Sequence, residues 1–337
     1  MALYFLHGVL AQLVRAPACH VGGRGFKSLT SRHRIRRTSF CEVLFVVSTY
    51  RRGIVTSPTQ SWPIGTPPFP AIGLEEFQAK VNQRGATLYR DLPWRNTRDP
   101  YAIWVSEVML QQTQVSRVNG RWQHWLERFP TVEALAYAEQ ADVLDEWQGM
   151  GYNRRALALI RASQSIAEAG AFPQDETALR ALPGIGPATA AGIRAFAFNL
   201  PGVYLETNVR TVFLHELFPQ EVGVADRTLI PLVDAACPTD DARTWYYALL
   251  DYGAWLKRTV PNPSRRSRAH VRQSKFEGSH RQKRATVVRL LLAARKEGVD
   301  ESSVAQSLQI PVDDARSLLD ELTHEGFCTQ RDARWFA

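Results

Sequence analysis

The sequence lacks two features that often decide a protein's class, namely paired cysteines and a long apolar run. Four cysteines occur in 337 residues. Cys19 and Cys41 lie near the N-terminus, whereas Cys237 and Cys328 are far from each other. Because this pattern builds neither a disulfide framework nor a zinc site, we expect a protein of a reducing cytosol. No run of 18 apolar residues is present, so we expect no membrane span.

Acidic residues are scarce in two parts of the chain. Residues 1–73 hold nine Lys/Arg and one acid, Glu42, whereas residues 74–337 hold 32 residues of each sign. The net charge of +8 therefore reflects the first 73 residues. Residues 257–289 hold 11 Lys/Arg and one acid, Glu277. A block of this kind is either a solvated stretch or a strip that contacts phosphates.

The first 73 residues resemble no protein family. The segments Ala11–Ala16 and Gly25–Ser28 fit the translation of a transfer-RNA gene, because they could be encoded by its D-arm and T-arm, in that order. We interpret residues 1–73 as a spurious upstream extension, and an Arg-rich transit peptide is the alternative. The proline-rich stretch 54–73 is expected to be disordered in either case.

An alternating strand pattern is absent before residue 320, whereas apolar residues recur at helical spacing from Leu74 onward. We therefore predict that residues 74–275 form an all-α domain. One predicted helix opens near Asp99-Pro100 and runs through Val115. The other predicted helices cover residues 77–88, 135–147, 156–169, 179–182, 188–198, 208–218 and 245–257.

Residues 283–337 resemble a winged helix. The pattern predicts helices at 285–294, 302–308 and 312–325, followed by a short hairpin of residues 327–331 and 334–336. The helix at 312–325, which would read DNA in such a fold, is acidic and poorly suited to a major groove. A small helical cap without a ligand is therefore the alternative.

The segment from Leu182 to Ala190, Leu-Pro-Gly-Ile-Gly-Pro-Ala-Thr-Ala, is a helix-hairpin-helix signature. Gly184 and Gly186 allow a tight turn between two helices and leave backbone N–H groups to point at a phosphate. A Gly-Ile-Gly segment can also be a simple turn. The preceding Leu-Pro and the following small residues favour binding of the DNA backbone.

Two further motifs are more specific. Pro93-Trp94-Arg95 and the segment from Ser106 to Val115, Ser-Glu-Val-Met-Leu-Gln-Gln-Thr-Gln-Val, resemble the helix-hairpin-helix DNA glycosylases, and among them the MutY-type adenine glycosylases. Gly149-Met150-Gly151-Tyr152 and Arg154-Arg155-Ala156 match a further element of this family. The resemblance covers about residues 76–273. It implies a two-lobed all-α fold and a monomeric base excision repair enzyme of the bacterial cytosol and nucleoid that binds mismatched or damaged double-stranded DNA.

The resemblance also assigns roles to individual side chains. Glu107 would protonate the flipped adenine, while Gln111 and Gln112 would wedge into the duplex. The chemistry agrees, since cleavage of an N-glycosidic bond requires a protonated purine and an anion beside the oxocarbenium-like sugar. Apolar neighbours such as Trp104 and Val108 would keep Glu107 protonated. The alternative is a surface or capping glutamate.

The second carboxylate departs from the family pattern. Where the family has Leu-Asp-Gly-Asn-Val, this chain has Leu205-Glu206-Thr207-Asn208-Val209. Glu206 could face the anomeric carbon or hold the attacking water, or it could instead cap the following helix. Ala188 occupies the position where bifunctional relatives carry a Schiff-base lysine. The expected reaction is therefore simple hydrolysis, without a covalent intermediate.

The family's iron–sulfur ligand spacing, C-x6-C-x2-C-x5-C, is present with every ligand replaced. Lys257, Ser264, Ser267 and Gln273 occupy the four positions, and none supplies a thiolate. We therefore expect no cluster, no other metal and no cofactor. We also expect the basic residues of this loop to contact DNA phosphates, namely Arg265, Arg266 and Arg268.

These observations together predict a monofunctional DNA glycosylase that removes adenine mispaired with guanine or 8-oxoguanine. Two alternatives stay open, a glycosylase for another mismatched or damaged base and a catalytically inactive DNA-binding relative. The Nudix-like module with which the family reads 8-oxoguanine is missing, and the winged-helix-like segment takes its place.

Overall fold

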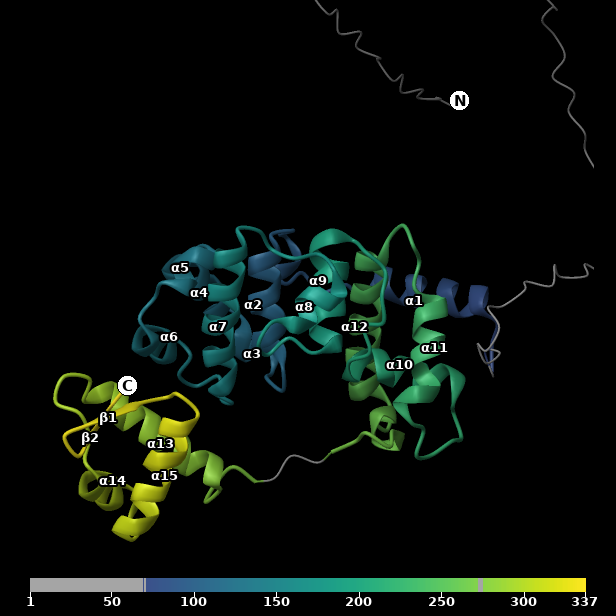
Figure 1. The fold of residues 1–337 in the computed structure, drawn as a ribbon. Coiled ribbons are helices and arrows are strands. Elements are labelled where there is room, and N and C mark those ends of the chain that lie inside the picture. The colour runs from purple at the N-terminus through teal and green to yellow at the C-terminus, as the bar shows by residue number, and fades with distance from the viewer. Residues whose placement is uncertain (1–68, 70, 272–274) are drawn as a thin grey trace, which may run out of the picture. The chain divides into compact units, whose positions relative to one another are not determined.

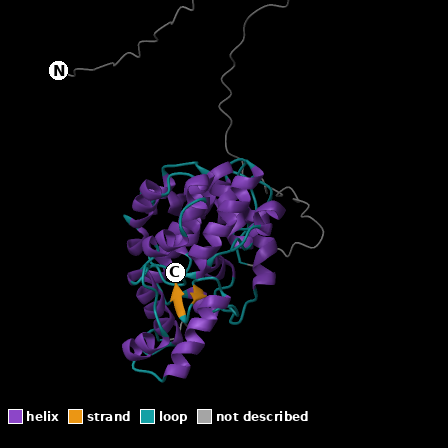
Figure 2. Ribbon diagram, turned by 60° about the vertical axis from the view of Figure 1, so that its left-hand side comes forward, coloured by secondary structure: helices purple, strands orange, loops and turns teal. Residues whose placement is uncertain are grey.

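The computed structural model describes Phe69 and residues 71–271 and 275–337 (Figure 1). The interpretation of residues 1–73 therefore falls almost entirely outside the described residues. Helices dominate the described part, and its two strands pair with each other (Figure 2). None of the helices in this part combines the length and the apolar character needed to cross a membrane. The all-α prediction for the body of the chain is confirmed.

The helices of the body form two groups. The first group contains α2 (Pro100–Leu110), α3 (Val115–Val118), α4 (Arg121–Arg128), α5 (Val132–Ala136), α6 (Gln140–Glu146), α7 (Arg154–Ala169), α8 (Glu176–Ala181) and α9 (Pro187–Phe198). The second group contains α1 (Leu74–Leu88), α10 (Thr207–Leu217), α11 (Asp226–Ala236) and α12 (Ala242–Thr259), with two 3-10 turns, η1 (Pro93–Arg95) and η2 (Pro263–Arg266).

Each group has its own hydrophobic core. Trp104, Trp125 and Trp147 are buried in the first, and Phe77, Phe213 and Trp245 in the second. Helices α2 and α9 pack against each other and contribute to both cores, since Ile103 of α2 belongs to the second core and Trp104 to the first. The two lobes therefore meet at these helices.

Helix α2 is shorter than its apolar pattern predicted. The side chain of Asp99 accepts a hydrogen bond from the Tyr101 amide at 3.0 Å, and Pro100 follows at the first helical position, as expected for a helix start. The helix ends at Leu110, and the chain turns through Gln112, whose φ of 54° is left-handed. The predicted continuation through Val115 is wrong, because Val115 begins the separate helix α3.

Besides α3, two helices were not predicted. Helix α4 has its tryptophans on one face, but they lie in a short and otherwise polar segment. Helix α11 contains Pro231, a residue that normally signals a helix boundary, and it buries Leu229, Leu232 and Val233.

The C-terminal module comprises α13 (His280–Ala293), α14 (Glu301–Leu308), α15 (Val312–His324), β1 (Thr329–Arg331) and β2 (Arg334–Phe336). This order matches the predicted helices and hairpin. The strands are antiparallel, with Gln330 opposite Trp335, and the turn residues Asp332 and Ala333 have φ values of 48° and 59°.

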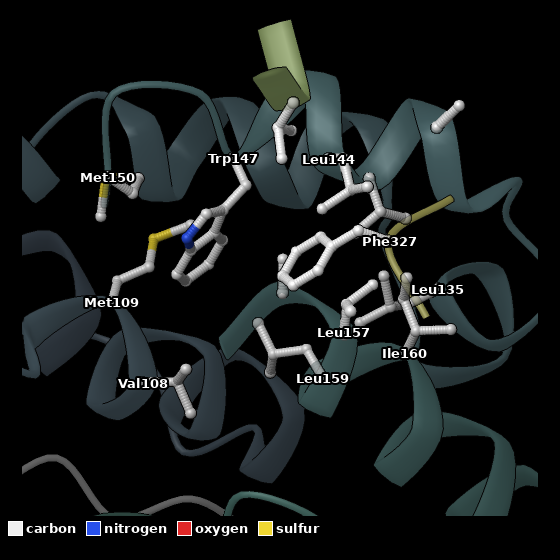
Figure 3. Close-up of a cluster of buried hydrophobic side chains, with 14 of the residues drawn as sticks. Val108, Met109, Leu135, Leu144, Trp147, Met150, Leu157, Leu159, Ile160 and Phe327 are labelled. Atoms are coloured by element: carbon white, nitrogen blue, oxygen red, sulfur yellow. The ribbon is translucent and has the colours of Figure 1, made fainter. Parts of the chain in front are cut away.

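The hydrophobic core of the module continues into that of the first lobe. Phe327, which precedes β1, is 2% exposed and belongs to the core of the first lobe. Its ring points inward between the side chains of Leu144 and Leu157 (Figure 3). The buried residues of the module are therefore continuous with those of the first lobe, and the assignment of residues 283–337 to a domain of their own stays a prediction.

Candidate active site

Glu107 lies where the two lobes meet. It sits in the last two turns of α2 and accepts a hydrogen bond at Oε2 from the hydroxyl of Tyr204, at 2.9 Å. Tyr204 belongs to the second core. The carboxyl group faces Gly192 of α9: a Cβ atom at position 192 would lie 2.3 Å from Glu107 Oε2 and 2.9 Å from the Tyr204 ring. The missing side chain of Gly192 thus creates the space that the carboxyl group occupies.

The surroundings of Glu107 favour its protonated form. Burial raises the pKa of Glu107 from 4.5 to about 8, the hydrogen bond from Tyr204 opposes this rise, and the negative charge of Glu206 adds to it. The neighbouring α2 residues Trp104, Val105 and Val108 are all buried. At neutral pH the group therefore holds a proton that it can donate.

Glu206 caps α10, as the alternative interpretation stated. Its Oε1 atom accepts hydrogen bonds from the amides of Asn208 and Val209, at 2.6 and 3.1 Å. Both bonds use the same oxygen, and Oε2 makes no hydrogen bond within the described residues. Glu206 is also close enough to raise the pKa of Glu107. The capping role therefore leaves the other carboxylate oxygen, Oε2, without a hydrogen bond among the described residues.

Gln111 and Gln112 follow α2 directly. The side-chain amide of Gln111 donates a hydrogen bond to Thr189 Oγ1 in the first turn of α9, at 3.1 Å. Gln112 is exposed and has a left-handed backbone conformation. The guanidinium of Arg155 donates to the carbonyl groups of Val108 and Gln111, both at 2.7 Å, and to that of Gly151 at 2.8 Å. Arg155 therefore ties the Gln111–Gln112 turn to the loop that carries Tyr152.

The Gly184 to Gly186 hairpin joins α8 to α9. Gly184 has a φ of 78°, and a Cβ atom there would lie 2.6 Å from Cβ of Ala158, so this position requires glycine. Gly186 does not, because its φ is −85° and no atom lies within 4 Å of an added Cβ. Ala188 lies in the first turn of α9, one turn before Gly192.

A cavity of about 270 Å³ opens beside the hairpin, between α2 and the start of α7. It is lined by Trp104, Val108, Gln111, Arg154, Arg155, Ala158, Leu159, Pro183 and Gly184. The predicted wedge residue Gln111 and the predicted phosphate-binding hairpin therefore share one concave surface.

The described residues at the cluster-ligand positions form hydrogen bonds with neighbouring protein groups. Lys257 donates to Asn208 Oδ1 at 2.8 Å, and the hydroxyl of Ser264 donates to Asn262 Oδ1 at 2.8 Å. Ser267 Oγ accepts from the Ala269 amide. These amine and hydroxyl groups do not fit an iron–sulfur cluster. Gln273 lies outside the described residues, within which no group of three or more His, Cys, Asp or Glu side chains could hold a metal ion.

The three arginines of this loop differ in what they can bind. Arg266 donates hydrogen bonds to the carbonyl groups of Leu214, Phe218 and Pro219, so it closes the C-terminal end of α10. These bonds occupy part of its guanidinium group, and the expected phosphate contact of Arg266 stays a prediction. Arg265 and Arg268 are exposed, and their assignment to DNA stays a prediction.

Three functional positions were missed by the sequence reasoning, namely Gly192, Tyr204 and Arg155. A glycine inside a helix signals close packing, so Gly192 could have been found. Arg155 was quoted only as part of a motif. Tyr204 gave no local signal, because its contact with Glu107 joins residues 97 positions apart.

The chain was compared with known proteins. Residues 105–236 match the model of the HhH-GPD superfamily of base excision DNA repair proteins. An adenine DNA glycosylase of Mycolicibacterium smegmatis is 40% identical over 169 residues, 49% of this chain and 58% of that protein. An adenine DNA glycosylase of Mycobacterium tuberculosis is 33% identical over 234 residues, 61% of this chain and 75% of that protein.

The coverage of these relatives is uneven. The chain spans 58% and 48% of the lengths of the first two curated relatives it matches, from Mycolicibacterium smegmatis and Buchnera aphidicola. A solved thermostable thymine-DNA glycosylase aligns with 54% of this chain and 86% of its own, at 22% identity and a TM-score of 0.48. On the sequence matches, the chain belongs to the HhH-GPD superfamily of base excision DNA repair proteins and, within it, to the family of the adenine DNA glycosylases.

Proposed function

We propose that this protein is a monofunctional DNA glycosylase that removes adenine mispaired with guanine or 8-oxoguanine from duplex DNA. The observation that carries the proposal is the carboxyl group of Glu107, which is half-buried, hydrogen-bonded to Tyr204 and protonated at neutral pH because its pKa is about 8. A perturbed acid of this kind, in a site shared by two lobes, argues against the inactive DNA-binding alternative.

The residues of the site would act in sequence. Glu107 donates its proton to a ring nitrogen of the extruded purine, which makes the base a better leaving group. The remaining Oε2 oxygen of Glu206 stabilises the positive charge on the sugar or holds the attacking water. Since Ala188 has no amine, water rather than a lysine completes the reaction.

DNA would be held by elements around this site. The Gly184–Gly186 hairpin presents the N-terminal amides of α9, which have no partner within the helix and attract a phosphate. Gln111 and Gln112 would enter the duplex beside the extruded base, and Arg265 and Arg268 would add phosphate contacts. We expect a monomer to bind in this way.

The test is base release from end-labelled duplexes that differ in one base pair. We expect cleavage of adenine opposite 8-oxoguanine and guanine and little release from other pairs. Glu107→Gln should lower the single-turnover rate by about 10²–10⁴-fold and leave DNA binding nearly unchanged. Glu168→Gln, at an exposed position of α7, is the matched control. Equal rates for Glu107→Gln and wild type, or release of a different base, would contradict the proposal.

We also propose that the enzyme works without an iron–sulfur cluster and without a covalent intermediate. Anaerobically purified protein should contain no stoichiometric iron and show no absorption near 400 nm. Borohydride should trap no protein–DNA adduct. Four iron atoms per chain would refute the first statement, and an efficient adduct would show that another lysine takes the role absent at position 188.

A further inference from the structure

Helices α10 and α12 approach each other closely at Gly253. A Cβ atom at this position would lie 2.3 Å from the carbonyl oxygen of Asn208 and 2.7 Å from its Cβ. The backbone of α12 therefore rests directly on the first turn of α10. Any side chain that follows Gly253 by one helical turn lies on the same face of α12. That side chain is Lys257.

Lys257 reaches back to the same first turn. Its ammonium group donates a hydrogen bond to Asn208 Oδ1 at 2.8 Å, and its side chain is partly buried. The backbone amide of Asn208 in turn donates to Glu206 Oε1 at 2.6 Å. Lys257 is thus connected to the carboxylate of Glu206 through one residue.

Among the cations near the first turn of α10, Lys257 makes no ion pair within the described residues. The two other cations that influence it, Arg210 and Arg90, are engaged elsewhere: Arg210 makes a bidentate ion pair with Asp226, and Arg90 pairs with Asp251. Burial lowers the pKa of Lys257, whereas the nearby Glu206 raises it. Lys257 and Glu206 therefore interact electrostatically although they make no direct ion pair.

We propose that Lys257 is a positioning residue for Glu206: through Asn208 it fixes the first turn of α10, so that Glu206 Oε1 caps the helix and Oε2 is held toward the reacting sugar. Lys257, which occupies the position of the first cluster ligand, would thus help to position a residue of the active site. The inference rests on the proposed function, because it assumes that Glu206 takes part in base release.

The central experiment compares Lys257→Met with wild type. Methionine keeps most of the length of the side chain but cannot donate a hydrogen bond. We expect the single-turnover rate of adenine release to fall by roughly 10- to 100-fold, since a shift of about 1 Å in a catalytic group can cost on the order of a hundredfold. The dissociation constant for a duplex should change by less than about twofold. Arg258→Met, at the next and exposed position, is the matched control and should behave as wild type.

Two further variants separate positioning from a general loss of structure. Lys257→Arg retains a donor for Asn208 Oδ1 and should recover most of the rate. Asn208→Ala should lower the rate as Lys257→Met does, and the double variant should be no slower than the slower single variant, because both changes break the same connection.

The outcomes distinguish this inference from the proposed function. If wild-type protein releases no adenine, the proposed function fails. If wild type is active and Lys257→Met equals it, or if the two single losses simply multiply, Lys257 does not position Glu206. A lowered melting temperature with an unchanged rate would likewise overturn the inference, because it would show a structural role alone.

Discussion

Glu107 keeps its proton because residues from three parts of the chain surround it. Helix α2 supplies the carboxyl group, α9 supplies the space at Gly192, and the segment before α10 supplies the hydroxyl of Tyr204. The carboxyl group is removed from water, yet it retains one hydrogen bond that limits the cost of ionisation. Its acidity is thus a property of the packing between the two lobes.

A pH dependence follows from this packing. The pKa of Glu107 is about 8, so base release should decline about tenfold per pH unit above pH 8. Tyr204→Phe removes the hydrogen bond that lowers this pKa, and the decline should then begin at a higher pH. Rates measured from pH 5 to 10 check this. A decline that stays in place or begins at a lower pH in the variant would contradict it.

The same shift has a consequence for stability. The pKa of Glu107 is higher in the folded chain than the ordinary value of 4.5. Between pH 4.5 and about 8 the unfolded chain loses the Glu107 proton while the folded chain keeps it. The free energy of unfolding therefore falls as the pH rises through this range, and it levels off above about pH 8.

Gly192 can be tested directly. In Gly192→Ala the new methyl group would overlap Glu107 Oε2 and the Tyr204 ring. We expect the carboxyl group to be displaced and the rate of base release to fall by about a hundredfold. Gly202→Ala is the control, because no atom lies within 4 Å of its added Cβ. Equal single-turnover rates for the two variants would show that the close approach at position 192 is not needed.

Among the elements, the hairpin between α8 and α9 was assigned from sequence and then refined by the structure. Both of its glycines were expected to serve the turn. The structure assigns that need to Gly184 alone, whereas Gly186 stands exposed at the N-cap of α9. A substitution at Gly184 therefore tests the folding of the hairpin, and a substitution at Gly186 tests its proposed contact with phosphate.

Alanine at each position should have a different effect. Gly184→Ala introduces a left-handed alanine that contacts Ala158, and it should lower the free energy of unfolding by about 1–3 kcal/mol. Gly186→Ala should leave stability unchanged and weaken duplex binding, because its methyl group would stand before the amides of α9. Denaturant unfolding and fluorescence anisotropy measure the two effects. Unchanged binding by Gly186→Ala would argue against a phosphate at the hairpin.

Sequence patterns predicted the elements whose signals are local. Capping residues and helical spacing predicted the start of α2 at Asp99-Pro100, the end of α7 at Gly170 and the order of the C-terminal helices. Long-range features did not follow. Arg266 looked like a phosphate ligand within a basic block, but its partners are carbonyl groups about 50 residues earlier.

The same limit applied to the site. Glu107 could be predicted because its motif is contiguous, while Tyr204 could not, since only the folded chain brings it to α2. For Glu206 both interpretations had been stated. The structure confirms the cap, and the catalytic role stays a prediction.

At the scale of the whole molecule, the C-terminal module and the first lobe are joined by polar contacts as well as by a common core. Glu325, after α15, accepts hydrogen bonds from Arg154 of α7 and Arg284 of α13. The hydrogen bond from Arg154 is the largest cause that lowers the pKa of Glu325 to about 2. Arg281 of α13 donates to the hydroxyl of Tyr152 at 2.8 Å. Arg284 also pairs with Glu321 of α15, so part of the acidic charge at this end of the helix is neutralised within the protein.

Phe327→Ala tests whether the lobe and the module unfold together. Loss of this buried ring should lower the free energy of unfolding by about 3–5 kcal/mol, in one transition seen alike by tryptophan fluorescence and circular dichroism. Phe276→Ala, at a position 50% exposed, should change stability by less than about 0.5 kcal/mol. A separate early transition of the C-terminal helices would show that the common core does not couple them.

The insertion of Phe327 also bears on how the chain is made. Its partners Leu157 and Ile160 are synthesised more than 150 residues earlier. The first lobe therefore cannot complete this part of its core before the module has been synthesised. A nascent chain that stalls before Phe327 would leave apolar side chains of the first lobe uncovered, where chaperones and proteases can reach them.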